Sequence, residues 1–117
     1  MGDGSKPRFL QGAFTFHGKG YESPVLLDAS LSYTVPAGAI TQPVYFRGGN
    51  STAELITVVI MRDGAAMRYF PIGAKDAVHV PLRVVEDLIA DTVLEVFIAA
   101  PDGLSGTVFV DIGLVEI

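Results

Sequence analysis

The chain ends with residues 107–117, which read T-V-F-V-D-I-G-L-V-E-I. Apolar side chains recur there at every second position, in the order Val108, Val110, Ile112 and Leu114. Because successive side chains of a β-strand point to opposite faces, this period of two predicts a strand with one buried face. The same alternation returns along most of the chain, and no long stretch repeats with the period of a helix. The sequence therefore predicts an all-β protein.

Further strands are predicted at residues 9–17, 31–35, 40–47, 54–62, 65–70, 77–80 and 93–99, most of them bounded by glycine or proline. Pro43 cannot donate a hydrogen bond to a ladder, so its segment is expected to be an edge strand or to contain a bulge. Residues 81–88 carry Leu82, Val85 and Leu88 three apart, which predicts one short helical turn. About eight short strands are typical of a two-sheet antiparallel β-sandwich or jelly roll.

The dipeptide Asp63-Gly64 predicts a tight hairpin turn between two of these strands. A type I′ turn needs positive φ at both central residues, and Asp-Gly is one of the pairs that adopts it most readily. The predicted register pairs Arg62 with Ala65, Ile60 with Met67 and Val58 with Tyr69. One face of the hairpin, expected to lie in the core, then holds Ile56, Val58, Ile60, Met67 and Tyr69.

The opposite face of the predicted hairpin is also apolar, and the last two strands repeat this feature. Exposed apolar patches of that size usually mark an interaction surface. We therefore predict a protein interface that includes Leu55, Val59, Met61, Phe70, Phe97 and Phe109. The alternative is that a loop such as residues 21–27 covers one of these patches, because connecting segments run over the surface.

Length and composition bound the domain organisation. A chain of 117 residues suits one core, so we predict a flexible N-terminal tail at residues 1–8 and a single domain at residues 9–117. Half of the residues are hydrophobic and 18% are charged, a small charged share for a domain that must cover its own surface. Association with another chain, as a homo-oligomer or in a larger assembly, is therefore expected.

The charge and cysteine content exclude several classes of partner and site. The net charge is −5 without a basic cluster, so we expect no nucleic-acid partner. The absence of cysteine excludes disulfides, thiolate metal sites and a cysteine nucleophile. No apolar run is long enough to span a bilayer. Residues 1–7 do not resemble a secretory signal, so the cytoplasm is the expected location, although a signal that had been removed would leave no trace.

The sequence lacks the common catalytic and metal-binding motifs. His17 and His79 are far apart and form neither an H-x-H nor an H-E-x-x-H pattern, and no serine lies in a G-x-S-x-G context. The glycine pairs at 18–20 and 48–49 are expected to be turns. We predict no catalytic residue, no metal and no cofactor, and an enzyme is the least favoured function class.

Arginine and tyrosine side chains near predicted loop ends are the candidate ligand-binding residues. Such side chains can bind a sugar or a carboxylate by stacking and bidentate hydrogen bonds. The candidates are Tyr45, Arg47, Asn50, Arg68 and Tyr69. The other interpretation is that each arginine points outward with its stem over a neighbouring ring. The leading hypothesis is thus a non-enzymatic β-sandwich that binds protein, and the alternative is a binding module for carbohydrate or another small polar ligand.

Overall fold

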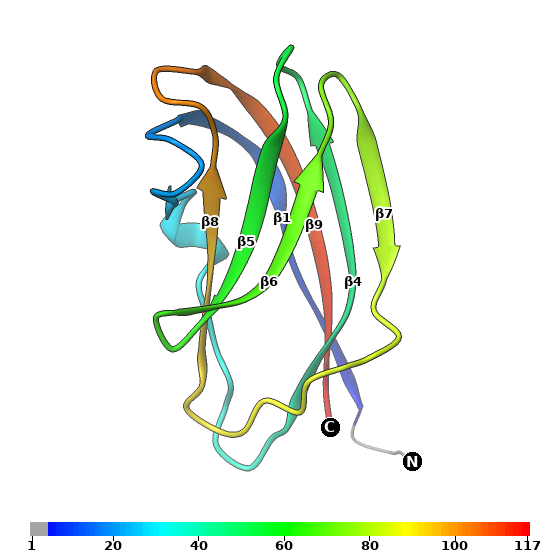
Figure 1. The fold of residues 1–117 in the computed structure, drawn as a ribbon. Helices are drawn as coiled ribbons and strands as arrows, with labels where there is room; N and C mark the ends of the chain where they lie inside the picture. Colours follow the sequence, from blue (N-terminus) through cyan, green and yellow to red (C-terminus); the bar gives the residue numbers. More distant parts are fainter. Residues whose placement is uncertain (1–4) are drawn as a thin grey trace.

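The computed structural model describes residues 5–117 as two antiparallel β-sheets that face each other (Figure 1). One sheet has the order β1-β9-β4-β7, with bounds Lys6–His17, Ser105–Glu116, Thr41–Asn50 and Ala77–Pro81. The other has the order β2-β8-β5-β6, with bounds Val25–Leu26, Val93–Ala99, Ile56–Arg62 and Ala65–Ile72. The short strand β3 (Tyr33–Thr34) also pairs with β8, and a 3-10 turn, η1, spans Ala29–Leu31.

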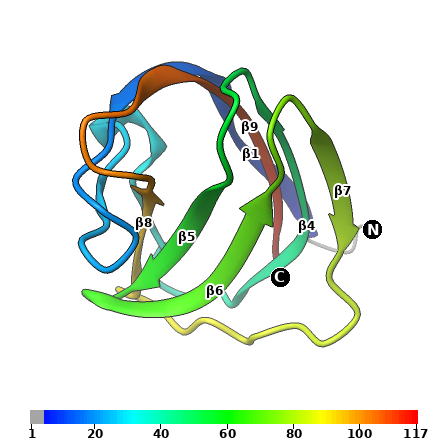
Figure 2. The same cartoon turned by 45° about the horizontal axis from the view of Figure 1, so that its top comes forward.

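The strands pair as a nested set, which defines the topology. β1 pairs with β9, β2 and β3 pair with β8, β4 pairs with β7, and β5 pairs with β6. The chain is therefore one long hairpin whose tip is the β5–β6 turn, and this hairpin is rolled into two sheets (Figure 2). This is the jelly-roll arrangement, so the predicted fold class is confirmed.

The core lies between the two sheets and is built from side chains of one parity on each strand. The predicted inward residues of β5, β8 and β9 are buried, namely Ile56, Val58, Ile60, Leu94, Val96, Ile98, Val108, Val110, Ile112 and Leu114. Phe46 of β4 has no exposed surface and stacks on Phe70 of β6, with ring centroids 4.2 Å apart. Because these two rings come from different sheets, their contact joins the two layers.

A polar cluster joins the same two sheets at one end of the sandwich. The carboxylate of Glu116 in β9 is almost fully buried and accepts hydrogen bonds from Arg8 Nε at 3.1 Å and from the Tyr33 hydroxyl at 2.5 Å. Burial, and secondarily the hydrogen bond to Glu116, raises the pKa of Tyr33, so its phenol stays protonated and donates. The buried carboxylate therefore has partners on β1 and β3.

Two predicted boundaries need correction. Lys6, Pro7 and Arg8, expected in a flexible tail, belong to β1 and pair with residues 114–116; residues 1–4 of that tail lie outside the described residues. Residues 81–88, expected to form a helical turn, do not form one: Pro81 ends β7, residues 82–87 are irregular, and Leu88 forms an isolated bridge with Thr41. Leu82 and Leu88 are buried there because the segment crosses from one sheet to the other, so their spacing does not report a helix.

Pro43 lies in an interior strand, since β4 pairs with both β9 and β7. The register between β4 and β9 shifts between Pro43 and Tyr45. The predicted alternative of a bulge is therefore confirmed, and the alternative of an edge strand is wrong.

The Asp63-Gly64 turn has the predicted geometry, but the register beyond it differs. Both φ angles are positive, 49° and 82°, as a type I′ turn requires, and Arg62 faces Ala65. A bulge between the Met61 and Ile60 pairs then shifts the pairing by one residue. Ile60 therefore faces Arg68, and Val58 faces Phe70. A shift of one residue exchanges the two faces of a strand. Phe70 is consequently in the core and Tyr69 is outside, the reverse of the prediction.

Replacing Gly64 with valine should lower the free energy of unfolding by about 1–3 kcal/mol, because a β-branched side chain resists positive φ. An added Cβ would meet no atom within 4 Å, so the cost comes from the backbone conformation alone. Urea denaturation measures the change. Gly64→Asn is the control, since asparagine tolerates this conformation and should lose less stability. If the two variants are equally stable, backbone strain is not the cause.

Candidate functional site

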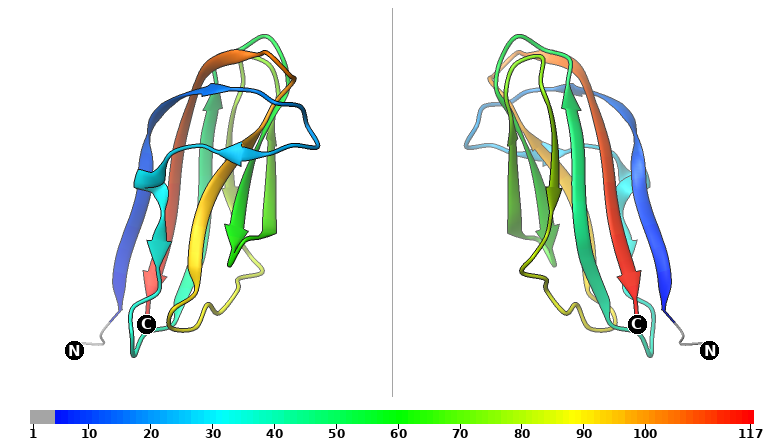
Figure 3. Two further views of the ribbon diagram at one scale, coloured as in Figure 1. Left: turned by 90° about the vertical axis from the view of Figure 1, so that its left-hand side faces the viewer. Right: turned by 90° about the vertical axis from the view of Figure 1, so that its right-hand side faces the viewer.

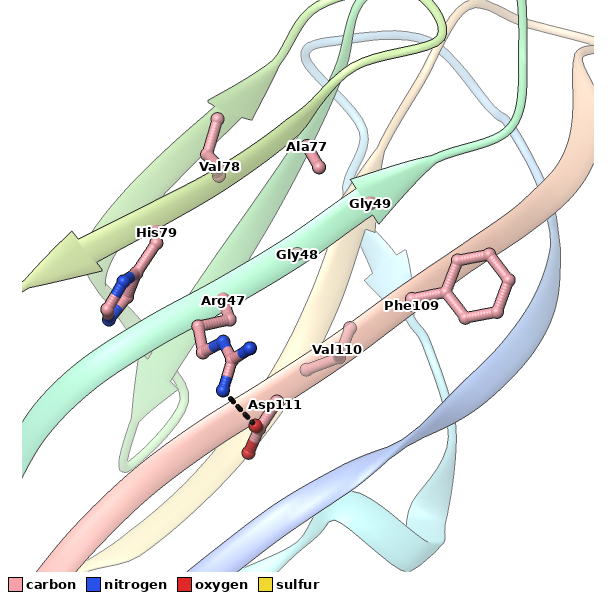
Figure 4. A pocket seen from close by; sticks show the side chains of 9 residues that line it. All are labelled: Arg47, Gly48, Gly49, Ala77, Val78, His79, Phe109, Val110 and Asp111. Carbon is pink, nitrogen blue, oxygen red and sulfur yellow. Dashed lines mark ion pairs between the residues drawn. The ribbon is translucent and has the colours of Figure 1, made fainter.

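A groove of about 520 Å³ lies on the outer face of the four-stranded sheet (Figure 4). Strands β4, β7 and β9 form it. Strand β1 lies beside β9 at the edge of the same sheet (Figure 3, right). The residues that line the groove are Arg47, Gly48, Gly49, Ala77, Val78, His79, Phe109, Val110 and Asp111. The side chains in the groove therefore come from three parts of the chain that are distant in sequence.

The strand register places the polar side chains of the groove in one row across the sheet. Asp111 of β9 pairs with Arg47 of β4, which pairs with His79 of β7, and Gln11 of β1 pairs with Asp111 on the other side. Paired residues of adjacent strands point to the same face. The row therefore presents a guanidinium, an imidazole, a carboxylate and an amide to solvent.

The neighbouring row is apolar and contains an exposed ring. Phe109 of β9 pairs with Gly49 of β4, and its side chain is about half exposed. A Cβ added to Gly49 would lie 3.4 Å from Phe109 Cδ2, so the ring lies beside bare backbone. Gly48 makes room for a core side chain on the inner face of the sheet, because a Cβ there would lie 2.7 Å from the ring of Phe46. Both glycines lie inside β4, so the predicted turn at 48–49 is wrong.

Asp111 is held by Tyr45, which lies one row away on β4. The Tyr45 hydroxyl donates a hydrogen bond of 2.9 Å to Asp111 Oδ1. Burial, and secondarily this hydrogen bond, raises the pKa of Tyr45, so the phenol stays a donor. The Tyr45 ring lies where a side chain on Gly113 would be, since a Cβ there would fall 2.0 Å from Cε2, and it meets the His79 ring edge-on at 6.1 Å.

Arg47 makes only a loose ion pair. Its Nη1 lies 3.7 Å from Asp111 Oδ2, beyond hydrogen-bond distance, and its side chain is 60% exposed. An exposed pair of this kind contributes little to stability. The guanidinium therefore keeps N–H donors directed to solvent and available to a ligand.

The five predicted ligand-binding residues do not converge. Arg47 lines the groove and Tyr45 lies beside it, bonded to Asp111, whereas Tyr69 lies on the outer face of the other sheet. Arg68 Nε donates to Glu86 Oε2 at 2.8 Å, and Arg68 also bonds the Val84 carbonyl, so it holds the 82–92 segment against β6.

Asn50, the fifth of these residues, is buried and serves the structure. Its Nδ2 donates to the carbonyl oxygens of Glu54, Ile72 and Gly73 at 2.8, 3.1 and 3.0 Å. Its Oδ1 accepts from Thr52 N and Thr52 Oγ1 at 2.9 and 2.8 Å. The amide thus joins the turn after β4 to the end of β6, and no part of it faces the groove.

Sequence reasoning missed His79, Asp111, Phe109 and Gly49 as groove residues. Asp111 and Phe109 do share one parity of β9, which was a usable signal, and the prediction did place Phe109 on the outside. Their meeting with β4 and β7 depends on pairing between distant strands, which local periodicity does not encode.

A second hollow contains the pair His17 and Ser105, with His17 Nδ1 2.7 Å from Ser105 Oγ. The two residues face each other across β1 and β9, and both are exposed. Ser105 begins a β-strand, so it lacks the strained strand-to-helix turn of a serine hydrolase nucleophile. The contact is an ordinary cross-strand hydrogen bond. Within residues 5–117, no three His, Asp or Glu side chains gather closely enough to hold a metal ion.

The residues of the predicted interface divide among three places. Val59, Met61 and Phe97 lie on the outer face of the five-stranded sheet, and Leu55 precedes β5. Phe109 lies on the other sheet, and Phe70 is in the core, which corrects its predicted outward position. The register aligns Leu26, Phe97, Val59 and Tyr69 in one row across the five-stranded sheet.

Residues 21–27 lie at the edge of this sheet. Leu26 extends the sheet as β2, and the Tyr21 hydroxyl donates to the Leu55 carbonyl at 2.7 Å. Val59 has no exposed surface, whereas Leu26 and Tyr69 at the two ends of the row are 44% and 63% exposed. The apolar face is therefore covered at its centre and open at its ends.

Comparison with known proteins identifies the fold and no family. No protein-family model and no curated protein matches the chain. Among solved structures it is similar to the CBM36-1 domain of a multidomain xylanase from the hindgut metagenome of Trinervitermes trinervoides, with 14% identity and a TM-score of 0.57, over 94% of this chain and 96% of that one.

Two viral structures are similar to the same extent. A chain of the cyanophage Pam1 capsid asymmetric unit matches with 20% identity and a TM-score of 0.53, over 99% of this chain and 87% of that one. A chain of infectious bursal disease virus, Gx strain, matches with 13% identity and a TM-score of 0.54, over 97% of this chain but 32% of that one. Identities this low indicate a shared fold alone.

The structure contains, over residues 5–117, no helix with the length and apolar character of a membrane span.

Proposed function

We propose that this protein is a non-enzymatic jelly roll that acts by protein–protein association, and that it forms a homo-oligomer through the outer face of its five-stranded sheet. The observation that carries the proposal is the composition of that face. Its outward positions are Leu26, Thr57, Val59, Met61, Ala66, Tyr69, Pro71, Glu95, Phe97 and Ala99, of which only Glu95 is charged. Val59 and Ala99 are buried within one chain, but Leu26 and Tyr69 of this face are exposed, whereas a sheet face that meets water normally carries polar residues at such positions.

A second copy of the chain is the partner that this face fits best. Two copies related by a twofold axis present the same apolar patch to each other, so no complementary charge is needed. A standard interface buries about 800 Å² on each partner, and its centre is depleted in charge and enriched in aromatic residues. The similarity to a capsid chain of nearly the same length supports a role in assembly, because there a jelly roll of this size is part of a multi-subunit structure.

Light scattering coupled to size exclusion tests the proposal. The wild type is expected to elute as a dimer or larger species at about 50 μM, and Tyr69→Lys as a monomer, because a charge in the apolar patch must be desolvated on association. Val59→Asp is unsuitable here, since Val59 is buried within one chain and the variant would unfold it.

Phe9→Lys is the matched control for Tyr69→Lys. Phe9 is an aromatic residue of similar exposure, 53%, and it belongs to the outer face of the other sheet. Its variant should keep the wild-type mass. A wild type that is monomeric at about 100 μM, or an equal loss of mass in both variants, would refute the proposed interface.

A second candidate function is the binding of a small polar ligand. The observation that favours it is the groove on the four-stranded sheet, where an exposed ring adjoins a row of hydrogen-bonding side chains. Sites of this size, with an apolar wall and few polar groups, are typical of small-ligand binding.

A further inference from the structure

We propose that the groove on the four-stranded sheet binds a neutral carbohydrate, with one sugar ring stacked on Phe109 and its hydroxyl groups hydrogen-bonded to Arg47, His79 and Asp111. The inference rests on the ligand-binding candidate function and names the class of ligand. It is independent of the proposed assembly, because the apolar face lies on the other sheet.

Phe109 and Gly49 together form the stacking surface. The Phe109 ring is 54% exposed on the interior strand β9, and it lies beside a residue without a side chain. A sugar ring has a face of C–H groups that packs on an aromatic ring, and phenylalanine offers an entirely apolar face. The absent side chain at Gly49 leaves room for a ligand to lie flat against the ring and the backbone.

The charges in the groove favour a neutral ligand over an anion. Arg47 donates hydrogen bonds, Asp111 accepts them, and the two side chains lie 3.7 Å apart, so their charges compensate. An anion bound by Arg47 would also meet the Asp111 carboxylate. Adjacent hydroxyl groups of a sugar each donate and accept, so they can bond both side chains together, and hydrogen bonds to charged groups are the stronger kind.

The polar side chains are held in place by the sheet. Tyr45 fixes Asp111 through its 2.9 Å hydrogen bond and packs edge-on against His79, and all of these residues stand on paired strands. Binding then costs little ordering of the protein, because sites built on strands are more rigid than sites on loops. Figure 4 shows Arg47, Asp111 and Phe109 along one side of the β4 backbone, with His79 beyond it.

Titration with soluble oligosaccharides, followed by the backbone amide signals in a ¹H–¹⁵N NMR spectrum, tests the inference. The probes are xylohexaose, cellohexaose and mannohexaose as neutral ligands, and hexagalacturonic acid as an anionic one, each up to about 10 mM. At least one neutral hexaose should saturate shifts of the amides of Gly49, His79, Phe109 and Asp111. Phe109→Ala should weaken this binding at least tenfold.

Gly49→Val should abolish the binding without altering a polar group, because its side chain would fill the floor of the groove. The control is Phe9→Ala, which removes an equally exposed ring from the same sheet outside the groove and should bind like the wild type. If Gly49→Val does not fold, as judged from its own spectrum, then Phe109→Ala is the deciding variant. Unchanged binding by Phe109→Ala would overturn the inference.

Binding of hexagalacturonic acid alone would overturn the neutral-sugar inference and retain ligand binding at the groove. Absence of binding by all four probes would overturn the inference and the ligand-binding candidate function together. A neutral hexaose that still binds Gly49→Val as tightly as wild type occupies another site, which also overturns the inference.

Discussion

Replacing Phe46 with alanine is expected to lower the free energy of unfolding by about 3–5 kcal/mol, the cost typical of removing a buried ring. Phe46 has no exposed surface, and its ring stacks on Phe70 of the opposite sheet at 4.2 Å with an interplanar angle of 6°. Neighbours cannot fill the space easily, because Gly48 beside the ring has no side chain to move into it. Denaturation in urea, monitored by circular dichroism, measures the loss.

Phe109→Ala is the control for this substitution, since it removes the same ring from the surface. The expected change is about 0.5 kcal/mol or less. A loss in Phe46→Ala no greater than in Phe109→Ala would show that the contact between the two sheets does not carry the stability assigned to it. The same measurement establishes that Phe109→Ala is folded when its carbohydrate binding is tested.

Replacing Asn50 with alanine is expected to cost about 2–4 kcal/mol, because it leaves several buried polar groups without partners. The carbonyls of Ile72 and Gly73 and the amide of Thr52 all lose their bonds to this side chain. Asn50→Asp should also be destabilising, since a carboxylate cannot donate to those carbonyls and brings a buried charge. Thermal unfolding of both variants gives the comparison.

Gln42→Ala is the matched control for Asn50→Ala. Gln42 also uses its side-chain amide, donating from Nε2 to Asp87 Oδ1 at 2.6 Å, but this bond lies at the surface. Water can replace a surface bond, so the expected loss is about 0.5 kcal/mol or less. If the two alanine variants have the same stability, then burial of the Asn50 amide is not what makes it important.

The predicted interface residues lie on different faces of the sandwich, partly because of one error in the predicted hairpin register. The Asp63-Gly64 turn was predicted correctly, yet a single extra residue in β6 exchanges the two faces beyond it. Phe70 moves into the core and Tyr69 moves to the surface, where it completes the apolar row. A bulge depends on packing and twist across the whole sheet, so the residues next to the turn do not predict it.

The sequence alone determined the features that depend on neighbours along the chain. Alternation of apolar residues identified the strands and the inward side chains of β5, β8 and β9, because side-chain direction in a strand has a period of two. Tertiary structure alone decided which strands lie together, and thus that Arg47, His79, Asp111 and Phe109 share a groove. It also decided that Asn50 is buried, since its partners lie in the turn after β4, at the end of β6 and just after β6. Arg47 and Asp111, which pair across β4 and β9, are 64 positions apart in the sequence. Pairing between residues so distant depends on the packing of the whole sandwich, and local sequence does not determine it.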